Sequence, residues 1–360
     1  MNELIIEKKD LVYNINKVKS AEMRNDYTII AVIKGNAYGL GALQFANVLI
    51  ENGINYFAVA GVNEALQLRQ AGLKEKLLLL TPIEDKTILE HLINNNIILT
   101  LDSEESIRIA NQIAQEIGRK INAHLKIDTG LARYGFRWDD EQIVSVLSKY
   151  KNIDYEGIYS HFSNSLASNN SWSETQFQRF NTSINNLEDN GYKFKLKHIC
   201  NSSGFFKYQN MHLNCARIGS AFCGLASGPD ADLRRVGVLH TKVTKIREVK
   251  KKETIGYANS YVAKKPMKIA VIPTGYFDGI GRDIETQRYK FLSRLKKALN
   301  DLKKSNMTLH INGEDMKVVG QIGMHDIVLD ITGKDYNEND DVYIDVRPVL
   351  IDSSVIRIYK

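Results

Sequence analysis

The sequence predicts an α/β protein in which an N-terminal (β/α)8 barrel of the TIM type, residues 1–236, precedes a mostly-β domain, residues 237–360. From Tyr27 onward, short β-rich runs alternate with amphipathic stretches of helical length. Eight such repeats with right-handed crossovers close a barrel, and they use the roughly 200 to 250 residues that this fold needs. After Val236, strands follow one another without long helices, which indicates a β-rich domain.

Local composition predicts each barrel element in order. The eight candidate strands are TIIAVIK, YFAVAG, KLLLLTP, IILTLD, NAHLKIDTG, YEGIYSHF, KLKHICNS and HLNCARIG. Helical periodicity, with Gly or Asn at several C-terminal ends, predicts helices in ALQFANVLIENG, VNEALQLRQAG, TILEHLINN, SIRIANQIAQEIG and IVSVLSKYK.

The second domain is predicted from strand-like runs and one inserted helix. The runs are HTKVTKIREV, SYVAKK, MKIAVIPTG, TLHING, MKVVGQIG, DIVLDIT and DVYIDV. The helix is expected near residues 285–304, where RYKFLSRLKKALNDLKK has apolar residues at helical spacing. Arg288 to Lys304 holds seven basic residues and one acidic residue, which accounts for the whole net charge of +6. We therefore expect a solvated basic face and no nucleic-acid binding, with anchoring to a membrane surface or a polyanion as a minor alternative.

Composition excludes several other classes of protein. The chain is 43% hydrophobic and 25% charged, with five prolines, so neither disorder nor a fibrous repeat is indicated. The apolar runs at 29–33 and 77–80 are far shorter than the roughly 18 residues that span a bilayer. The charged start MNELIIEKKDL predicts a cytoplasmic protein without a signal peptide. Cys200, Cys215 and Cys223 lack metal-site spacing, so we expect buried free thiols and no metal.

The segment AVIKGNAYGLG, residues 31 to 41, carries a lysine at the end of the first barrel strand. Active sites of such barrels lie at the C-terminal ends of the strands. A partly desolvated Lys34 has a depressed pKa, which frees its amine to form a Schiff base with a carbonyl. From its position alone, a surface lysine with its stem along apolar residues is an equal alternative.

Other strand ends add polar and cationic groups. KIDTGLARYGF follows the fifth strand, YSHF the sixth, HICNSSG the seventh and CARIGSAFCG the eighth. Hydroxyls and backbone N–H groups after strands seven and eight suit a phosphate. Together with Lys34 they indicate a pyridoxal 5'-phosphate site. The residues concerned are Lys126, Arg133, His161, Asn201, Ser202, Ser203, Arg217 and Gly219.

The motifs also follow a known order. AVIKGNAYGLG, KIDTGLARYGF, YSHF, NSSG, ARIG, IGYANSY, PTGYFDG and GQIGM resemble those of the alanine racemase family, over most of the chain. The resemblance implies a pyridoxal-phosphate-dependent isomerase of fold type III that makes D-alanine, a peptidoglycan precursor. It also implies a homodimer with active sites at the subunit interface.

The resemblance assigns roles to the barrel residues. Lys34 would carry the cofactor and act as one base, and Arg217 would face the pyridine nitrogen. Because an arginine keeps its proton, that nitrogen stays unprotonated and the cofactor becomes a weaker electron sink. Tyr38, Ser202, Gly219 and Ser220 would hold the phosphate. Arg133 would bind near the substrate carboxylate, and Lys126, often carbamylated in the family, would orient Arg133.

Racemisation needs a proton group on each face of the substrate carbon. The resemblance assigns Tyr257, in IGYANSY, as the second base, supplied by the other subunit. A nearby pair of His161 and Arg217 would lower the pKa of this phenol. Tyr276 and Met324 would line the same wall. Judged without the resemblance, Tyr257 is more simply a sheet tyrosine with a bonded hydroxyl.

Three features depart from the family pattern. Met324 is followed by His325, and the expected Asp comes only at 326. Ser353 stands where the family has a tyrosine that bounds the substrate methyl. The stretch between Tyr276 and Met324 is enlarged by the basic helix. Ser353 widens the pocket, so serine or a larger amino acid is an alternative to alanine.

Other functions remain as alternatives. A fold-type III decarboxylase would use the same lysine but is expected to pair the ring nitrogen with an acidic residue, unlike Arg217. A pyridoxal phosphate carrier would lack the second domain. An unrelated phosphate-binding barrel enzyme is the last alternative.

Overall fold

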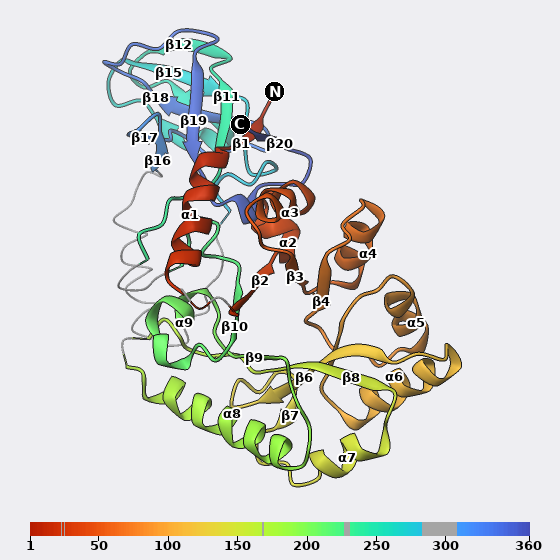
Figure 1. The fold of residues 1–360 in the computed structure, drawn as a ribbon. Helices are drawn as coiled ribbons and strands as arrows, with labels where there is room; N and C mark the ends of the chain where they lie inside the picture. Colours follow the sequence, from red (N-terminus) through yellow and green to blue (C-terminus); the bar gives the residue numbers. More distant parts are fainter. Residues whose placement is uncertain (23, 25, 168, 227–230, 283–307) are drawn as a thin grey trace. The chain divides into compact units, whose positions relative to one another are not determined.

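The computed structural model describes residues 1–22, 24, 26–167, 169–226, 231–282 and 308–360 (Figure 1). The chain divides into a barrel unit, Lys8–Val236, and a β unit, Met1–Glu7 with Gly237–Lys360. The predicted fold class, a (β/α)8 barrel followed by a mostly-β domain, is confirmed. The basic helix expected near 285–304 lies outside the described residues.

Eight parallel strands form the barrel wall, and all eight were predicted. Their order is β4-β3-β2-β10-β9-β8-β6-β5, and the short β7 (Phe136–Arg137) pairs with β6. The ring closes where the Leu79 N–H donates to the Ile98 carbonyl at 2.9 Å and the Ile98 N–H donates to the Leu77 carbonyl at 2.8 Å. The strands are β2 (Thr28–Val32), β3 (Tyr56–Val59), β4 (Lys76–Leu79), β5 (Leu99–Leu101), β6 (Ile121–Asp128), β8 (Ile153–Tyr159), β9 (Leu196–His198) and β10 (Cys215–Ile218).

Helices surround these strands (Figure 1). The sequence predicted five of them: α3 (Ala42–Glu51), α4 (Val62–Gln70), α5 (Lys86–Asn94), α6 (Glu104–Glu116) and α7 (Ile143–Lys149). Polar residues masked the periodicity of α8 (Ser171–Asp189), which buries Phe180, Ile184 and Leu187. The remaining helical segments of the barrel unit are α1 (Lys8–Ser20), α2 (Lys34–Tyr38), α9 (Ser202–Lys207) and η1 (Gln209–Met211).

The barrel interior holds both apolar and polar side chains. One apolar cluster takes side chains from strands around the ring, namely Ile30, Val32, Tyr56, Ala58, Leu78, Ile98, Leu196 and Cys215. Side chains two residues further along a strand share its face. His198 and Arg217 therefore lie inside the barrel, nearer the C-terminal ends of the strands, and both are buried. The barrel interior thus combines an apolar cluster with buried polar side chains.

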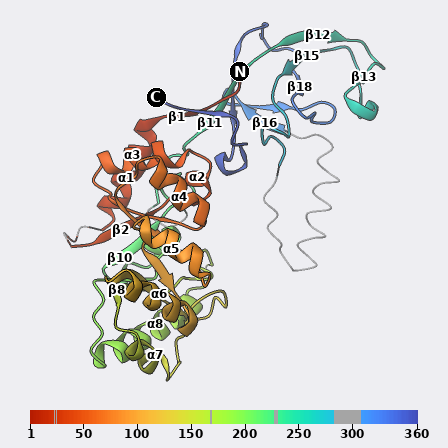
Figure 2. The ribbon, with the colours of Figure 1, turned by 90° about the vertical axis from the view of Figure 1, so that its right-hand side faces the viewer.

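The β unit is built almost wholly of strands (Figure 2). A six-stranded sheet has the order β17-β16-β19-β11-β1-β20, and smaller sheets join β12-β15-β18 and β13-β14. Its elements are β1 (Glu3–Ile6), β11 (Val238–Lys242), β12 (Lys245–Val249), β13 (Thr254–Ile255), η2 (Tyr257–Asn259), β14 (Tyr261–Val262), β15 (Met267–Ile272), β16 (Thr308–Ile311), β17 (Glu314–Lys317), β18 (Ile327–Asp330), β19 (Asp341–Asp345), η3 (Pro348–Leu350) and β20 (Ile356–Tyr359).

Two details of this unit differ from the sequence prediction. Residues 1–7, assigned to the barrel, include β1, which pairs antiparallel with β11 and parallel with β20. The run HTKVTKIREV, expected as one strand, forms β11 and β12, which belong to different sheets. Local composition cannot show either feature, because long-range pairing decides both.

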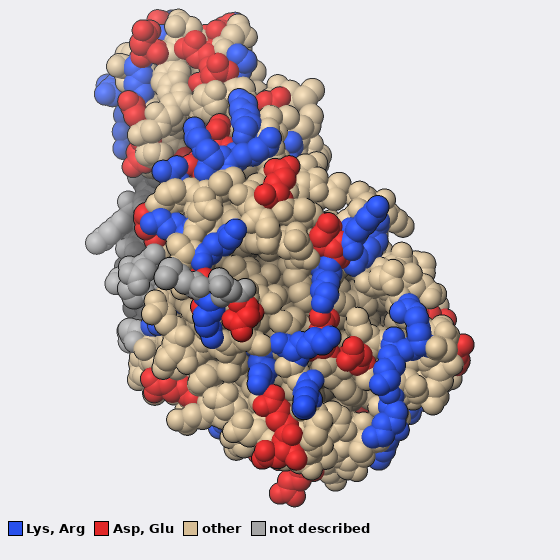
Figure 3. All heavy atoms as spheres, in the orientation of Figure 1, with Lys and Arg blue, Asp and Glu red and all other residues tan. Residues whose placement is uncertain are grey.

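Three further properties concern the described residues. The three cysteines are buried and free, as predicted. None of the described helices is long and apolar enough to cross a membrane. On the face drawn in Figure 3, basic and acidic side chains of the described residues are interspersed.

Candidate active site

A left-handed turn follows Lys34 at the end of β2. Residues 35–37 of α2 have φ angles of 63°, 54° and 53°, a conformation that costs non-glycine residues about 1 to 2 kcal/mol each. Two hydrogen bonds hold it: the Asn36 N–H donates to Glu64 Oε1 at 2.9 Å, and the Ala42 N–H donates to Asn36 Oδ1 at 2.7 Å. The turn fixes the direction in which the chain leaves Lys34.

The pKa of Lys34 is lowered, although the residue as a whole keeps an exposed surface. Desolvation is the main cause, and the charges of Arg133 and Arg217 add to it, whereas Glu64 opposes them. A lysine in such surroundings holds its proton less tightly and is a better nucleophile. The sequence predicted this property of Lys34.

Arg217, on β10, is the most heavily bonded side chain at this end of the barrel. Its Nη1 donates to His198 Nδ1 at 2.6 Å and to the His198 carbonyl at 3.3 Å. Its Nη2 donates to the Ser160 carbonyl at 2.7 Å and to His161 Nδ1 at 2.9 Å. Four of the five guanidinium N–H groups are thus engaged. The fifth, on Nε, makes no hydrogen bond to the described part of the chain.

His161 follows β8 and lies beside Arg217. Burial lowers the pKa of His161 well below its usual value, with contributions from Arg217, Lys126, Arg133 and Lys34. Its imidazole is therefore neutral near pH 7. Since Nδ1 accepts from Arg217, the ring proton is on Nε2, where it is available for donation.

A cradle of donors lies between the ends of β9 and β10. Ser202 Oγ, at the start of α9, accepts from the Gly219 N–H at 3.0 Å and from the Ala221 N–H at 3.2 Å. Its own proton therefore remains free to donate. A Cβ on Gly219 would lie 2.5 Å from the Tyr38 hydroxyl, so this phenol sits directly against the turn. Within the described ranges, neither the Tyr38 hydroxyl nor the Ser220 N–H has a hydrogen-bond partner. The predicted phosphate-binding residues are thus brought together.

Lys126 and Arg133 complete the cationic group. Lys126, on β6, is 3% exposed, and burial, with Arg217 and Arg133, lowers its pKa to about 7. Its Nζ lies 4.2 Å from the centre of the Tyr159 ring. The Arg133 guanidinium is exposed and makes no ion pair with any described residue. A guanidinium that makes no ion pair with the described residues, and lies near a lysine amine, suits a substrate carboxylate.

Sequence reasoning missed three residues that support this site. Tyr159 contacts both Lys126 and Arg217, whose Cζ lies 4.8 Å from the centre of the tyrosine ring. His198 stacks on the same ring at 5.0 Å. Glu64 anchors the left-handed turn. Alternation along β8 and β9 could have placed Tyr159 and His198 inside the barrel, but a buried aromatic residue in a strand is ordinarily core.

The β unit brings the other predicted residues together by itself. Tyr257, Tyr276 and Met324 are 71%, 45% and 50% exposed. The Tyr276 N–H donates to the Gly323 carbonyl at 3.0 Å, so the loops of Tyr276 and Met324 are adjacent. The Gln321 N–H donates to Ser260 Oγ at 2.9 Å and ties in the loop of Tyr257. The three side chains therefore lie on neighbouring loops of one unit. We call these loops, residues 255–260, 274–278 and 320–326, the aromatic loops.

Ser353 is exposed on the loop before β20. The Asp352 N–H donates to the Asp278 carbonyl at 3.1 Å, and both Arg357 Nη atoms donate to carbonyls of the loop. The loop is thus fixed next to the one that carries Tyr276. Its serine presents a hydroxymethyl group to solvent.

The class of the protein follows from these observations. A (β/α)8 barrel with its amines, guanidinium groups and hydroxyl turn at the C-terminal ends of its strands is a barrel protein with an anion-binding active-site face. Within the described ranges, no group of three or more His, Cys, Asp or Glu residues is arranged to hold a metal ion.

Comparison with known proteins specifies the family. The family profile "Alanine racemase, N-terminal domain" matches residues 6–227, and "Alanine racemase, C-terminal domain" matches residues 236–348. The chain belongs to the alanine racemase family, which is a family of isomerases. The resemblance found in the sequence is thereby confirmed.

Relatives cover most of the chain. "Alanine racemase 2" of Caldanaerobacter subterraneus subsp. tengcongensis is 32% identical over 330 residues, 89% of this chain and 79% of that protein. The alanine racemase of Clostridium tetani is 34% identical over 286 residues, 78% and 73% of the two chains. Among solved structures, the alanine racemase of Clostridium difficile 630 has a TM-score of 0.87 at 28% identity and covers 100% of this chain and 95% of its own.

Proposed function

We propose that the protein interconverts L- and D-alanine with pyridoxal 5'-phosphate as its cofactor, in a homodimer that completes each active site with residues of the partner subunit. The observation that carries the proposal is the Lys34 amine, which has a lowered pKa and lies in the same cationic group as Arg217. Membership of the alanine racemase family supports the substrate.

The residues present fit the cofactor. Its aldehyde would be held by Lys34, and its pyridine nitrogen by the spare Nε–H of Arg217. Its phosphate would be held by Tyr38, Ser202 and Ser220 at the turn of Gly219, whose own N–H donates to Ser202 Oγ. When bound, the cofactor withdraws electrons from the substrate α-carbon and acidifies its proton. A guanidinium partner leaves the ring nitrogen unprotonated, which supports proton exchange over decarboxylation.

The chain's own groups move the proton. The Lys34 amine, with its lowered pKa, serves one face of the α-carbon. The other face is served by Tyr257 of the partner subunit. The Nε2–H of neutral His161 is free to donate to that phenol and to stabilise its anion, which lowers the pKa of the phenol. Two groups of moderate basicity, one on each face, are what racemisation requires.

The exposed aromatic loops support the dimer. Tyr257, Tyr276, Phe277 and Met324 are all at least 44% exposed in the β unit. Large apolar side chains grouped on a surface are typical of a face that another protein covers. A second copy of the chain is the occupant that the two-base mechanism needs.

Substrate binding is assigned to Arg133 and Lys126. The free guanidinium of Arg133 would pair with the carboxylate. Because the pKa of Lys126 is lowered to about 7, much of its amine is neutral at physiological pH and can add carbon dioxide, releasing one proton and forming an anionic carbamate. That anion would fix Arg133 in place. Dependence of activity on added bicarbonate tests this step.

The function is tested with the purified protein, pyridoxal phosphate and a panel of L-alanine, L-serine and L-lysine, with D-product measured by chiral chromatography. We expect D-alanine to form fastest. L-Serine is the second candidate, because Ser353 replaces a phenol that would bound the substrate side chain. Failure to form any D-amino acid, together with no exchange of the α-proton in deuterium oxide, would contradict the proposal.

A further inference from the structure

We propose that His198, His124 and Tyr56 form a directional hydrogen-bond chain through the barrel interior that positions Arg217. Arg217 Nη1 lies 2.6 Å from His198 Nδ1, His198 Nε2 lies 2.9 Å from His124 Nδ1, and His124 Nε2 lies 2.8 Å from the Tyr56 hydroxyl. Their exposed fractions are 3% for Arg217, 0% for both histidines and 6% for Tyr56. The hydrogen-bond chain therefore runs through the protein core.

The arginine fixes the direction of every link. A guanidinium only donates, so His198 Nδ1 must be an unprotonated acceptor. The proton of His198 is then on Nε2 and is donated to His124 Nδ1. The proton of His124 is in turn on Nε2 and is donated to the Tyr56 oxygen. Reversal of any link would place two N–H groups face to face at His198 or leave a buried donor without an acceptor, at about 1 to 3 kcal/mol.

The barrel is modified to admit His124. The pairing of β6 with β8 shifts register between Ala123 and His124. On β8, Gly157 faces the ring: a Cβ there would lie 2.6 Å from His124 Cε1 and Nδ1. The bulge and the glycine lie at the same point and make space for the imidazole ring. A smaller apolar side chain at this position would not need that space. These features indicate a specific place for the imidazole.

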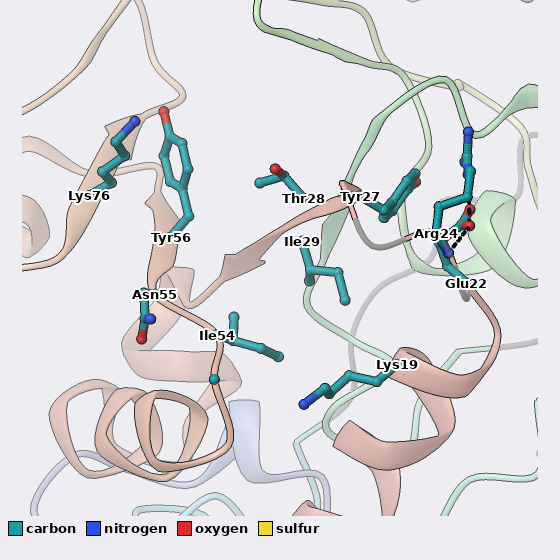
Figure 4. A pocket seen from close by; sticks show the side chains of 11 residues that line it. Lys19, Glu22, Arg24, Tyr27, Thr28, Ile29, Ile54, Asn55, Tyr56 and Lys76 are labelled. Carbon is teal, nitrogen blue, oxygen red and sulfur yellow. Dashed lines mark hydrogen bonds and ion pairs between the residues drawn. The ribbon is translucent and has the colours of Figure 1, made fainter.

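The hydrogen-bond chain ends at the opposite end of the barrel from Lys34. Tyr56 is the first residue of β3, and it lines a cavity of about 540 Å³ with Lys76, the first residue of β4 (Figure 4). Lys76 Nζ lies 5.4 Å from the centre of the Tyr56 ring and forms an ion pair with Glu156. These contacts hold the last member of the chain in place.

Burial, together with nearby positive charge, keeps both imidazoles neutral. Burial lowers the pKa of His198 well below its usual value, and Arg217, His124 and Lys126 contribute. Burial, Arg217 and Lys76 lower the pKa of His124 to about 3. At neutral pH each ring can therefore accept a hydrogen bond at Nδ1 and donate one from Nε2. The rigidity that they give to Nη1 extends to the Nε–H, because the guanidinium is planar.

The first test uses the protein without cofactor, so it does not depend on the proposed function. Nitrogen-15 NMR should show one tautomer for each ring, with the proton on Nε2 in both. His124→Asn retains an acceptor near the Nδ1 position, whereas His124→Leu, of similar size, removes it. We expect His198 to keep its proton on Nε2 in both variants, because Arg217 still donates to Nδ1. The proton signal of the His198 Nε2–H should move upfield in His124→Leu, where its acceptor is lost, and stay in place in His124→Asn. An Nδ1 proton in the wild type, or an unmoved Nε2–H signal in the leucine variant, would overturn the hydrogen-bond chain.

Two further variants keep this test decisive. Tyr56→Phe removes only the hydroxyl, so it applies even where His124→Leu does not fold. It should move the proton signal of the His124 Nε2–H upfield, because the acceptor of that group is lost, and an unmoved signal would refute the link to Tyr56. His212→Leu is the control, since His212 is also buried, at 3% exposed, but bonds to Glu22 and the Phe205 carbonyl. It should leave His198 unchanged.

The second test examines the effect on Arg217 and rests on the proposed function. With pyridoxal phosphate labelled at the pyridine nitrogen, the nitrogen signal should be that of an unprotonated ring in the wild type and in His124→Asn. It should move toward the protonated position in His124→Leu. An unmoved signal would overturn the positioning role. If the wild type binds no cofactor, the proposed function fails, while the cofactor-free measurement still decides the chain.

Discussion

Lys34 illustrates how position determines the chemistry of a residue. An ordinary lysine is a cation with a pKa near 10.4, and its amine is blocked by a proton at physiological pH. Here desolvation and two guanidinium groups lower that pKa, and the left-handed turn fixes the chain that follows. The same residue type at Lys120 is simply exposed on the surface.

At this scale we predict that Lys34→Ala abolishes both covalent cofactor binding and racemisation. The methyl group can neither bond the aldehyde nor move a proton, so activity should fall by about 10⁴-fold, the upper range for a lost acid–base group. Absorbance of the protein mixed with pyridoxal phosphate and a D-alanine assay measure the two effects. Lys120→Ala is the control, and retention of both properties in Lys34→Ala would remove the central assignment.

At the scale of the elements, the turn after β10 requires a residue without a side chain. Gly219 lies against the Tyr38 hydroxyl at one side, and a Cβ there would also be 2.9 Å from the Val32 carbonyl. The phenol can move aside, but the carbonyl belongs to β2 and cannot. The cradle therefore requires glycine at this position for reasons of space.

We predict that Gly219→Ala weakens binding of pyridoxal phosphate by roughly 10- to 100-fold, as expected for an overpacking cost of about 1 to 3 kcal/mol. Fluorescence titration with the cofactor provides the dissociation constant. In the matched control Gly61→Ala, the new Cβ would meet its nearest atom at an ordinary 3.6 Å, so affinity should not change. Equal affinities of the two variants would refute a cradle at Gly219.

His124 on β6 and His198 on β9 lead to a prediction of how the stability of the fold depends on pH. Their pKa values are lowered in the folded state, to about 3 for His124, whereas an unfolded histidine titrates near 6.5. Below pH 6.5 the unfolded state therefore binds more protons than the folded state, and stability is lost as pH falls.

Each buried histidine should remove about 1.4 kcal/mol of unfolding free energy per pH unit below 6.5. Urea unfolding at pH 7, 6 and 5 measures this slope, and His124→Asn should reduce it by one such increment. A slope identical in the wild type and in the variant would show that His124 is charged in the folded state.

For the whole molecule, the proposed site is shared between two chains. Lys34→Ala and Tyr257→Phe would each inactivate a homodimer, but by damaging different halves of the site. In mixed dimers, one of the two sites receives both intact residues. Equal amounts of the two variants, after subunit exchange, should therefore recover roughly a quarter of the wild-type activity.

The mixture is compared with each variant treated alone. Dilution to monomer should abolish the recovered activity, and analytical ultracentrifugation should follow the dissociation. A mixture no more active than its components, although mixed dimers form, would place both bases in one chain.

Much of this protein could be predicted from local sequence. Eight β-rich runs alternating with helical periodicity gave the barrel, and polar residues at strand ends gave Lys34, His161 and Arg217 as site candidates. The helix α8 was missed because serine and asparagine obscure its apolar stripe. His124 and Tyr56 were missed because nothing local distinguishes a hydrogen-bonded interior residue from ordinary core.

The sequence by itself determined the order of strands and helices and the residue types available at each strand end, because periodicity and turn chemistry are local. Only the tertiary structure decided that β1 pairs in the β unit and that two histidines link Arg217 to Tyr56. It also decided that the Arg217 Nε–H has no hydrogen-bond partner among the residues that the structure describes. These depend on contacts between residues far apart in the chain. Burial and hydrogen-bond partners, which set pKa values and tautomers, exist only once the barrel has closed.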